Sequence, residues 1–479
     1  MHRRKFLAML TAAGLGGVRL EGSGVREDAP RRLRAGAAVS DITPALGVSL
    51  DGVIMQIGPA EKIHDPLCAR CLVLDDARSR VAIVVADVTM AKARVLNRAK
   101  LLAHERTGIP TEHMLMAATH THAAPRMMGA PTADIDREYY ELFCQRIADA
   151  VEAAVERLAP AMIGWGSAHV PQFTENRRWF VKPGTMPPNP FGQTTDHVLM
   201  YGNRKGIGTK PSGPVDPELT VVSVRHADGR PMAVLANYSV HYVGGYGRRT
   251  VSSDYFGCFA QRIAELLAAE SSGADVVGIM SNGTSGDTAA VGGGYPKMAA
   301  MAEVLATEAA EVCRQAAHRD VVPLVVRRSD VQLGIRRPDE AQLRWARTAL
   351  SKPLTEGEHK WRNIYAREAL LLSQYPPTVR LRLQALGIGE LGIVAVPCEV
   401  FAATGLAIKT ESPMKPVFTI GLANGHQGYL PTPEAHTLGG YETWPARSSC
   451  LEVNAEPKVR GKVLELLQEV ADATAEGQS

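Results

Sequence analysis

Short, largely apolar runs that end in polar residues are the feature that most constrains this chain. They lie at 81–88, which is rich in Val and Ile, and at 112–117, 391–396 and 417–420. Such runs are typical of strands buried on both faces, which occur where helices cover both sides of a sheet. Between them are stretches with helical spacing, at 91–106, 137–158, 255–269, 297–317, 339–372, from about 401, and at 456–475. The pattern predicts an α/β protein with mixed sheets flanked by helices.

Two further segments refine this organisation. Residues 219–224 and 232–237 flank Asp228-Gly229 and are predicted to form a hairpin. Residues 182–217 are rich in Pro and Gly and are predicted to form a long loop. Loops of that length are usually functional or mobile.

The first residues differ in kind from the rest. Met1 to Leu7 contains adjacent arginines followed by Phe-Leu, and an Ala/Gly-rich apolar stretch continues to about Val18. That stretch is too short and weakly apolar to span a bilayer, and the whole resembles a twin-arginine export signal. We expect residues 1–35 to be signal and linker, residues 36–479 to be the folded body, and the protein to be exported to the periplasm or beyond.

Charge and cysteine content exclude several classes of protein. The formal net charge is +3, and no basic run is interleaved with aromatic residues, so nucleic-acid binding is not indicated. The seven cysteines are an odd number, which argues against a disulfide scaffold. Cys68 and Cys71 have the spacing of a metal or redox pair, but they lie within a predicted strand and no second pair follows.

Histidines follow two of the predicted strands. His120 and His122 come directly after the run 112–117, and residues i and i+2 at a strand end point to the same face. His241 follows the second strand of the predicted hairpin. Neutral imidazole is the commonest protein ligand for zinc, and a catalytic zinc keeps an open position beside its protein ligands. Because ligands collect at the carboxyl ends of strands in α/β proteins, these residues predict a metal-hydrolase site.

Further strand ends carry residues of the same kind. Residues 280–287 are dense in small donors and acceptors, Glu399 follows the run 391–396, and the stretch 421–429 ends at Tyr429. In this order, the Thr-His-Thr-His, Tyr-Ser-Val-His, Pro-Cys-Glu and Gly-Tyr…Tyr-Glu blocks resemble those of the neutral/alkaline non-lysosomal ceramidase family, over about 36–455. The resemblance implies a ceramidase-type catalytic domain.

The resemblance also implies a role for individual residues. It implies that Zn²⁺ is held by His120, His241, Glu399 and Tyr429. His122, Arg177 and Tyr441 are then expected to bind substrate and to stabilise the transition state, with Asp287 as a further catalytic residue. We expect Asn282, Ser285 and Thr288 to contribute to substrate binding.

The chain departs from the family pattern in two places. Gly286-Asp287-Thr288-Ala289 puts alanine where the family has a functional serine. The chain also ends soon after the last block, so we expect a short bacterial-type member without the family's C-terminal immunoglobulin-like domain. Both departures bear on the substrate and leave the predicted metal site intact.

The predicted function is a zinc-dependent hydrolase that cleaves the amide bond of ceramide or a related N-acyl compound through a zinc-activated water. Its expected partner is a small-molecule or lipid amide, with transient contact to a membrane surface left open and no oligomeric state indicated. Two alternatives are a zinc hydrolase of a carboxylic, phosphate or sulfate ester, and a non-catalytic exported binding protein. A third has Ser285 as nucleophile, although its surroundings lack the Gly-x-Ser-x-Gly spacing.

Overall fold

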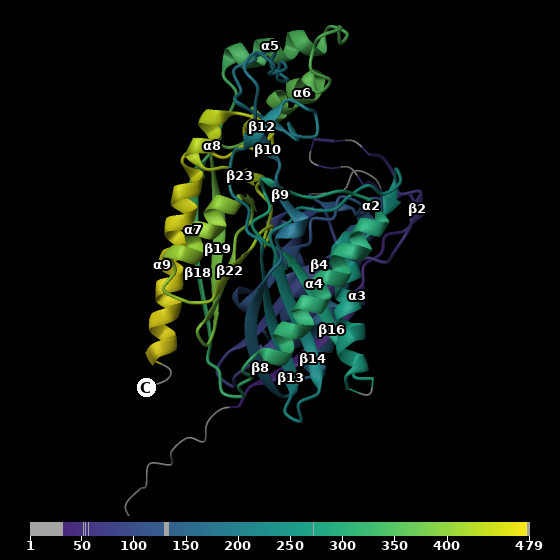
Figure 1. Ribbon diagram of the computed structural model, residues 1–479, viewed down its shortest axis with the longest axis vertical. Coiled ribbons are helices and arrows are strands. Elements are labelled where there is room, and N and C mark those ends of the chain that lie inside the picture. The colour runs from purple at the N-terminus through teal and green to yellow at the C-terminus, as the bar shows by residue number, and fades with distance from the viewer. Residues whose placement is uncertain are drawn as a thin grey trace, which may run out of the picture. The chain divides into compact units, whose positions relative to one another are not determined.

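A mixed eight-stranded sheet dominates the protein, whose computed structural model describes residues 32–50, 52, 54–55, 57–128, 134–271 and 273–476 (Figure 1). The strand order is β16–β14–β13–β8–β1–β3–β4–β6. The pairs β14–β16 and β4–β6 are parallel, and the other neighbours are antiparallel. The strands are β1 (Arg34–Asp41), β3 (Cys68–Asp75), β4 (Arg80–Ala86), β6 (Met114–Ala118), β8 (Ala159–His169), β13 (Glu218–His226), β14 (Pro231–Tyr238) and β16 (Val277–Asn282). The predicted export signal and most of its linker, residues 1–31, lie outside the described residues.

A second sheet of four strands faces the first. Its order is β18–β19–β20–β22, and only β20 and β22 are parallel. Its strands are β18 (Leu324–Gly334), β19 (Thr378–Ile388), β20 (Leu391–Ala395) and β22 (Val417–Ile420).

The two sheets share one apolar core, and helices cover their outer faces (Figure 1). Along β3, Leu72 and Leu74 point into the core that includes Ile393 of the second sheet, whereas Cys71 and Val73 face the helices. This alternation is what period-two geometry gives when both faces are buried. Helices α1 to α4 cover the large sheet, and α9 packs on β18 and β19. The helices are α1 (Ala93–Thr107), α2 (Asp134–Glu156), α3 (Asp254–Ala269), α4 (Tyr295–Gln315), α5 (Glu340–Leu350), α6 (Arg362–Leu372), α7 (Ala402–Glu411), α8 (Pro433–Leu438) and α9 (Ala455–Glu476).

One topology occurs three times. An antiparallel hairpin is followed by a helix and by a strand parallel to the second strand of the hairpin. The three units are β3–β4–α1–β6, β13–β14–α3–β16 and β19–β20–α7–β22. Each unit sets two carboxyl strand ends side by side, which is where α/β proteins bind ligands.

Short strands connect the loops that follow these ends. In the pair β21–β23, Glu399 lies opposite Tyr429, and in the pair β17–β9, Thr288 lies opposite Asn176. Each pairing therefore joins two of the polar stretches predicted to form the site. The short strands are β2 (Lys62–Ile63), β5 (Met90–Ala91), β7 (Arg126–Met127), β9 (Thr174–Asn176), β10 (Arg178–Val181), β11 (Val198–Met200), β12 (Gly208–Pro211), β15 (Thr250–Val251), β17 (Thr288–Ala290), β21 (Glu399–Val400) and β23 (Tyr429–Leu430).

The α/β prediction with mixed sheets and flanking helices is confirmed, and two of its segments need correction. The stretch 339–372 is two helices, since Pro353 and Gly357, which has φ +85°, interrupt it between α5 and α6. The stretch 182–217 is only partly loop, because β11 and β12 pair with the two edges of β10.

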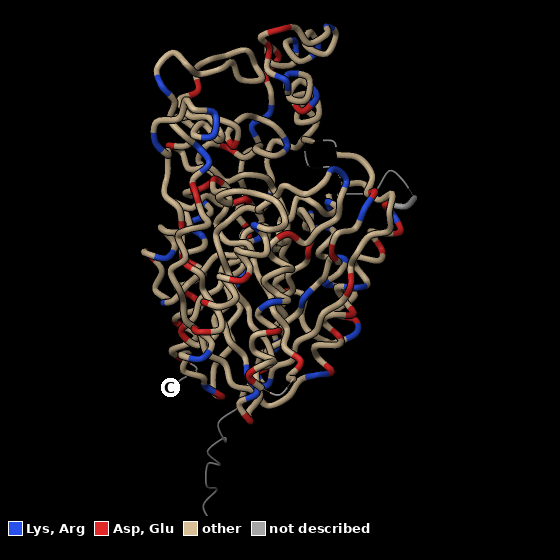
Figure 2. The backbone as a smooth tube through the Cα atoms, turned by 45° about the vertical axis from the view of Figure 1, so that its right-hand side comes forward, with Lys and Arg blue, Asp and Glu red and all other residues tan. Residues whose placement is uncertain are grey.

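The distribution of charged residues and the state of the cysteines agree with what the composition indicates. Acidic and basic residues are interspersed along the chain (Figure 2). All seven cysteines are free, and Cys68 and Cys71, three residues apart on β3, point to opposite faces and cannot share a ligand. Among the described helices, none has both the length and the apolar composition of a membrane span.

Candidate metal centre

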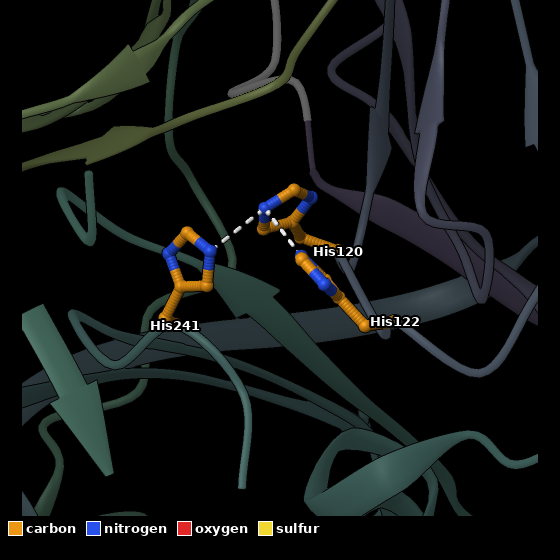
Figure 3. A group of neighbouring side chains, drawn as sticks. All are labelled: His120, His122 and His241. Carbon is orange, nitrogen blue, oxygen red and sulfur yellow. Dashed lines mark hydrogen bonds between the residues drawn. The ribbon is translucent and has the colours of Figure 1, made fainter. Parts of the chain in front are cut away.

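Three histidines meet at the carboxyl ends of β6 and β14 (Figure 3). The Nε2 atom of His120 lies 3.0 Å from Nε2 of His241 and 3.2 Å from Nε2 of His122. The backbone N–H of His120 donates to the carbonyl of Val88, which fixes the turn after β6. His120 has φ +72°, a conformation that costs energy in a non-glycine residue and often marks a functional site.

Backbone carbonyls set the tautomers of two of these rings. The Nδ1 atom of His120 lies 2.6 Å from the carbonyl oxygen of Thr89, and Nδ1 of His241 lies 3.0 Å from that of Ser285. A carbonyl oxygen can only accept, so each Nδ1 carries a proton, and in the neutral form of either ring Nε2 keeps its lone pair. Burial first, and then Arg177, holds the pKa of His241 well below its ordinary value, which keeps that ring neutral. Two lone pairs 3.0 Å apart repel unless a cation lies between them.

Glu399 supplies a third acceptor at the same point. Its Oε2 atom lies 3.3 Å from Nε2 of His120 and 3.8 Å from Nε2 of His241. The carboxylate is buried, and Oε2 has no hydrogen-bond partner among the described residues. A buried carboxylate oxygen without a donor is costly, so it too calls for a cation.

The donor set fits zinc. With bonds of 2.0–2.2 Å to nitrogen and oxygen, a tetrahedral zinc separates its ligand atoms by about 3.3 Å. The distances from Nε2 of His120 to Nε2 of His241, Nε2 of His122 and Oε2 of Glu399 are 3.0, 3.2 and 3.3 Å, close to that value. The sequence predicted His122 as a substrate-binding residue; the structure also brings its Nε2 into the group that could hold a metal. Its ring stacks on Tyr242, with centroids 3.9 Å apart.

The other predicted residues surround this centre. The Tyr429 hydroxyl accepts a hydrogen bond from Nη2 of Arg177 at 3.1 Å, and the Tyr441 ring lies 5.8 Å from that of Tyr429. Arg177 also donates through Nε to Glu442 at 2.7 Å. Sequence reasoning gave Glu442 no role, yet it is fully buried and also accepts from Arg178 at 2.8 Å. The structure thus unites Arg177, Tyr429 and Tyr441 beside the histidines, with Glu442 fixing the arginine.

Asp287, Asn282 and Thr288 connect the loops of the site. Asp287 accepts from the backbone N–H of Ala402 at 2.8 Å and from Asn176 at 2.9 Å, so it joins the start of α7 to the strand before Arg177. Asn282 donates to the carbonyl of Thr119 at 3.1 Å. Thr288 donates to the carbonyl of Ser239 at 2.9 Å. These contacts hold the histidine loops in place.

Neither Ser285 nor Ala289 has the surroundings of a catalytic serine. The Ser285 hydroxyl is buried and has no hydrogen-bond partner within the described part of the chain, so no histidine there is placed as its base. Ala289 is buried in β17 opposite Glu175. A nucleophile activated by an adjacent base is therefore not what this arrangement provides.

His426 is a residue of the site that sequence reasoning did not assign. Its Nε2 lies 3.2 Å from Oε1 of Glu399 and donates to it, which leaves Oε2 directed at the histidines. The signal available in the sequence was its position in the polar stretch after β22. Hydrogen bonds of this kind orient metal-binding carboxylates.

We expect His426→Ala to weaken metal affinity by about 10- to 100-fold, because Glu399 loses the donor that orients it. His426→Gln keeps an N–H donor and should recover part of the affinity. Titration of the apo protein with Zn²⁺ against a competing chelator measures both variants. Unchanged affinity in His426→Ala would show that the contact does not orient Glu399.

The chain is similar to known proteins in sequence family and in fold. The family model described as neutral/alkaline non-lysosomal ceramidase, N-terminal, matches residues 33–297, more than half of the chain. The neutral ceramidase from Pseudomonas aeruginosa has the same fold, with TM-score 0.69 and 17% identity over 92% of this chain and 75% of that one. A structure described as ceramidase complexed with C2 gives TM-score 0.69 and 16% identity over 92% and 76%. Comparison with curated proteins gave no match. By its sequence, the chain belongs to the neutral/alkaline non-lysosomal ceramidase family.

Proposed function

We propose that this protein is a zinc-dependent amidohydrolase that cleaves the amide bond of ceramide or a related N-acyl compound. The observation that carries the proposal is the convergence of the Nε2 atoms of His120 and His241 on the unpartnered Oε2 of Glu399. Membership of the ceramidase family supports the choice of amide substrate. The neighbours that share the fold are themselves described as ceramidases.

Residues His120, His241 and Glu399 would hold the ion, with His122 and Tyr429 beside them. A bound Zn²⁺ supplies a Lewis acid and lowers the pKa of a water ligand to about 7. Arg177 and Tyr441 provide positive charge and a hydroxyl donor next to the centre, where negative charge develops on the carbonyl oxygen during amide hydrolysis. Glu442 and Gly286 fix the Arg177 guanidinium by accepting at 2.7 and 2.8 Å, so it is positioned before substrate arrives.

We expect Tyr441→Phe to lower kcat for the amide by about 100- to 1000-fold, with a smaller change in KM, since it removes one oxyanion donor. Tyr365→Phe is the matched control. Tyr365 contacts Trp444, as Tyr441 does, and its hydroxyl has no hydrogen-bond partner in the described residues. Steady-state kinetics that show equal losses in both variants would remove Tyr441 from the chemistry.

A matched pair of substrates tests the reaction class. The zinc-loaded protein is given a short-chain ceramide and the carboxylic ester with the same acyl group. Release of the fatty acid from the amide supports the proposal. Cleavage of the ester alone would favour the second candidate, a zinc esterase, for which Ala289 in place of the family's serine is the motivating observation. Turnover of neither substrate, with zinc bound, would indicate a binding protein.

The export signal and domain boundaries are also part of the proposal. We propose residues 1–35 as a twin-arginine-like signal with its linker, of which Arg34 and Ala35 already belong to β1, and residues 36–479 as the catalytic domain that reaches the periplasm or the medium. The paired arginines Arg3 and Arg4 before an apolar stretch support this. Replacing both by lysine should retain the protein in the cytoplasm, as cell fractionation would reveal, and unchanged export would contradict the assignment.

A further inference from the structure

A second, cationic cavity of about 220 Å³ adjoins the metal centre and shares His426 with it. It lies between the start of α1, strand β19 and the loop after β22. Four of its lining residues are basic, and its single lining carboxylate, Asp330, is already paired with Arg382 at 3.0 Å. The basic lining residues are Lys92, Lys100, Arg380 and Arg382.

The two lysines of the cavity donate to uncharged acceptors. Lys100 is only 6% exposed, and its Nζ donates to Oδ1 of Asn424 at 2.7 Å. Nζ of Lys92 donates to the backbone carbonyl of His426 at 2.8 Å. Within the described residues, neither ammonium has an acidic side chain at ion-pair distance, and buried lysines without such a partner are rare.

Burial, followed by Arg382 and Arg328, lowers the pKa of Lys100 to about 7. Burial also lowers the pKa of Lys92. An anion between these groups would offset the cost of keeping both ammonium groups charged.

The start of α1 adds backbone donors to the same cavity. Ala93, the first residue of this 15-residue helix, lines the cavity, and no side chain caps the helix or places an acid in its first turn. Free N–H groups and the positive end of the helix dipole favour bound anions.

We propose that this cavity binds a small oxyanion, namely the phosphate group of either a free phosphate or a lipid headgroup. The two lysine ammonium groups and the N–H groups at the start of α1 bind its oxygens, and Arg380 and Arg382 form the cationic rim. The proposal concerns binding alone and does not depend on the reaction that the metal centre performs.

In the simpler alternative, Lys100 has only a structural role. In that case its contact with Asn424 serves only to hold the loop after β22, because Asn424 also donates to Gln384 at 2.7 Å and accepts from the N–H of Met116 at 3.1 Å. The alternative predicts loss of stability in a Lys100 variant and no change in anion binding.

Isothermal titration of the zinc-loaded full chain with inorganic phosphate, at constant ionic strength, separates these accounts. We expect saturable binding that weakens at least about tenfold in Lys100→Met and in Lys92→Met, since each removes a charged donor, which is buried at Lys100 and half-buried at Lys92. Lys352→Met, at an exposed site outside the cavity, should bind like the wild type. Phosphate binding that is equally strong in both cavity variants would place the anion on the metal and would overturn the proposal.

Vesicles distinguish the two sources of phosphate. The site binds a lipid headgroup if the protein prefers phosphatidylglycerol vesicles to phosphatidylcholine vesicles, loses that preference in Lys100→Met, and does not bind inorganic phosphate. Binding of inorganic phosphate with the same dependence would assign it to the free anion. If neither probe binds in a manner that depends on Lys100 or Lys92, the proposal is wrong.

Discussion

Replacing His120 by alanine is expected to abolish stoichiometric zinc binding and to lower amide hydrolysis by about 1000-fold or more. The reason is geometric, because His120 Nε2 is the atom to which His241, His122 and Glu399 all lie within 3.3 Å. The Lewis acid contributes several kcal/mol of transition-state stabilisation, and each 1.4 kcal/mol is a factor of ten. Metal content by mass spectrometry and hydrolysis of a labelled ceramide measure the two effects.

His113→Ala is the matched control for this substitution. His113 lies just before β6, at the opposite end of the strand from His120, and its Nδ1 lies 3.2 Å from the carbonyl oxygen of Arg80. It should keep both zinc and activity. A His120→Ala protein that is folded, holds one zinc and retains its activity would contradict the assignment of the centre.

Replacing Arg177 by methionine is expected to lower kcat by about 100- to 1000-fold and to destabilise the protein by on the order of 3 kcal/mol. The loss of rate follows from removal of the cation beside Tyr429. The loss of stability follows because Glu442 is fully buried and keeps only one of its two arginine partners. Steady-state kinetics and urea unfolding measure the two losses separately.

Arg178→Met separates the two effects. Arg178 pairs with the other oxygen of Glu442 at 2.8 Å, but its remaining bonds go to the backbone carbonyls of Ala435 and Gly439. It should therefore lose a similar amount of stability while keeping most of its activity. If both variants lose activity in proportion to stability, Arg177 has only a structural role.

The fold was predictable where burial dominates the sequence pattern. The apolar runs that form β4, β6, β20 and β22 are apolar on both faces, because each of these strands lies between the core shared by the two sheets and the helices. The long strands β8, β18 and β19 escaped prediction for the opposite reason. Only part of β18 is buried, and its alternating Arg, Asp and Gln residues leave no apolar run. Its pairing along eleven residues with β19 is a non-local contact that no local pattern reports.

The candidate site was predictable in its residue types and less so in its contacts. Histidines, glutamate and tyrosine at strand ends marked the centre, because polar residues after buried strands need a reason to be there. The hydrogen-bond partner of each side chain comes from another segment of the chain. Glu399 and His426 are 27 residues apart, and Arg177 and Glu442 are 265 residues apart. Such pairings depend on how the three hairpin–helix–strand units pack, and a single sequence carries little information on that packing.

The most direct test of the account is hydrolysis of a fluorescent short-chain ceramide before chelation, after chelation and after return of zinc. We expect activity that disappears with the metal and returns with zinc, because Nε2 of His120 and His241 and the unpartnered Oε2 of Glu399 converge on one point. Activity that survives complete removal of the metal, as verified by mass spectrometry, would contradict the account.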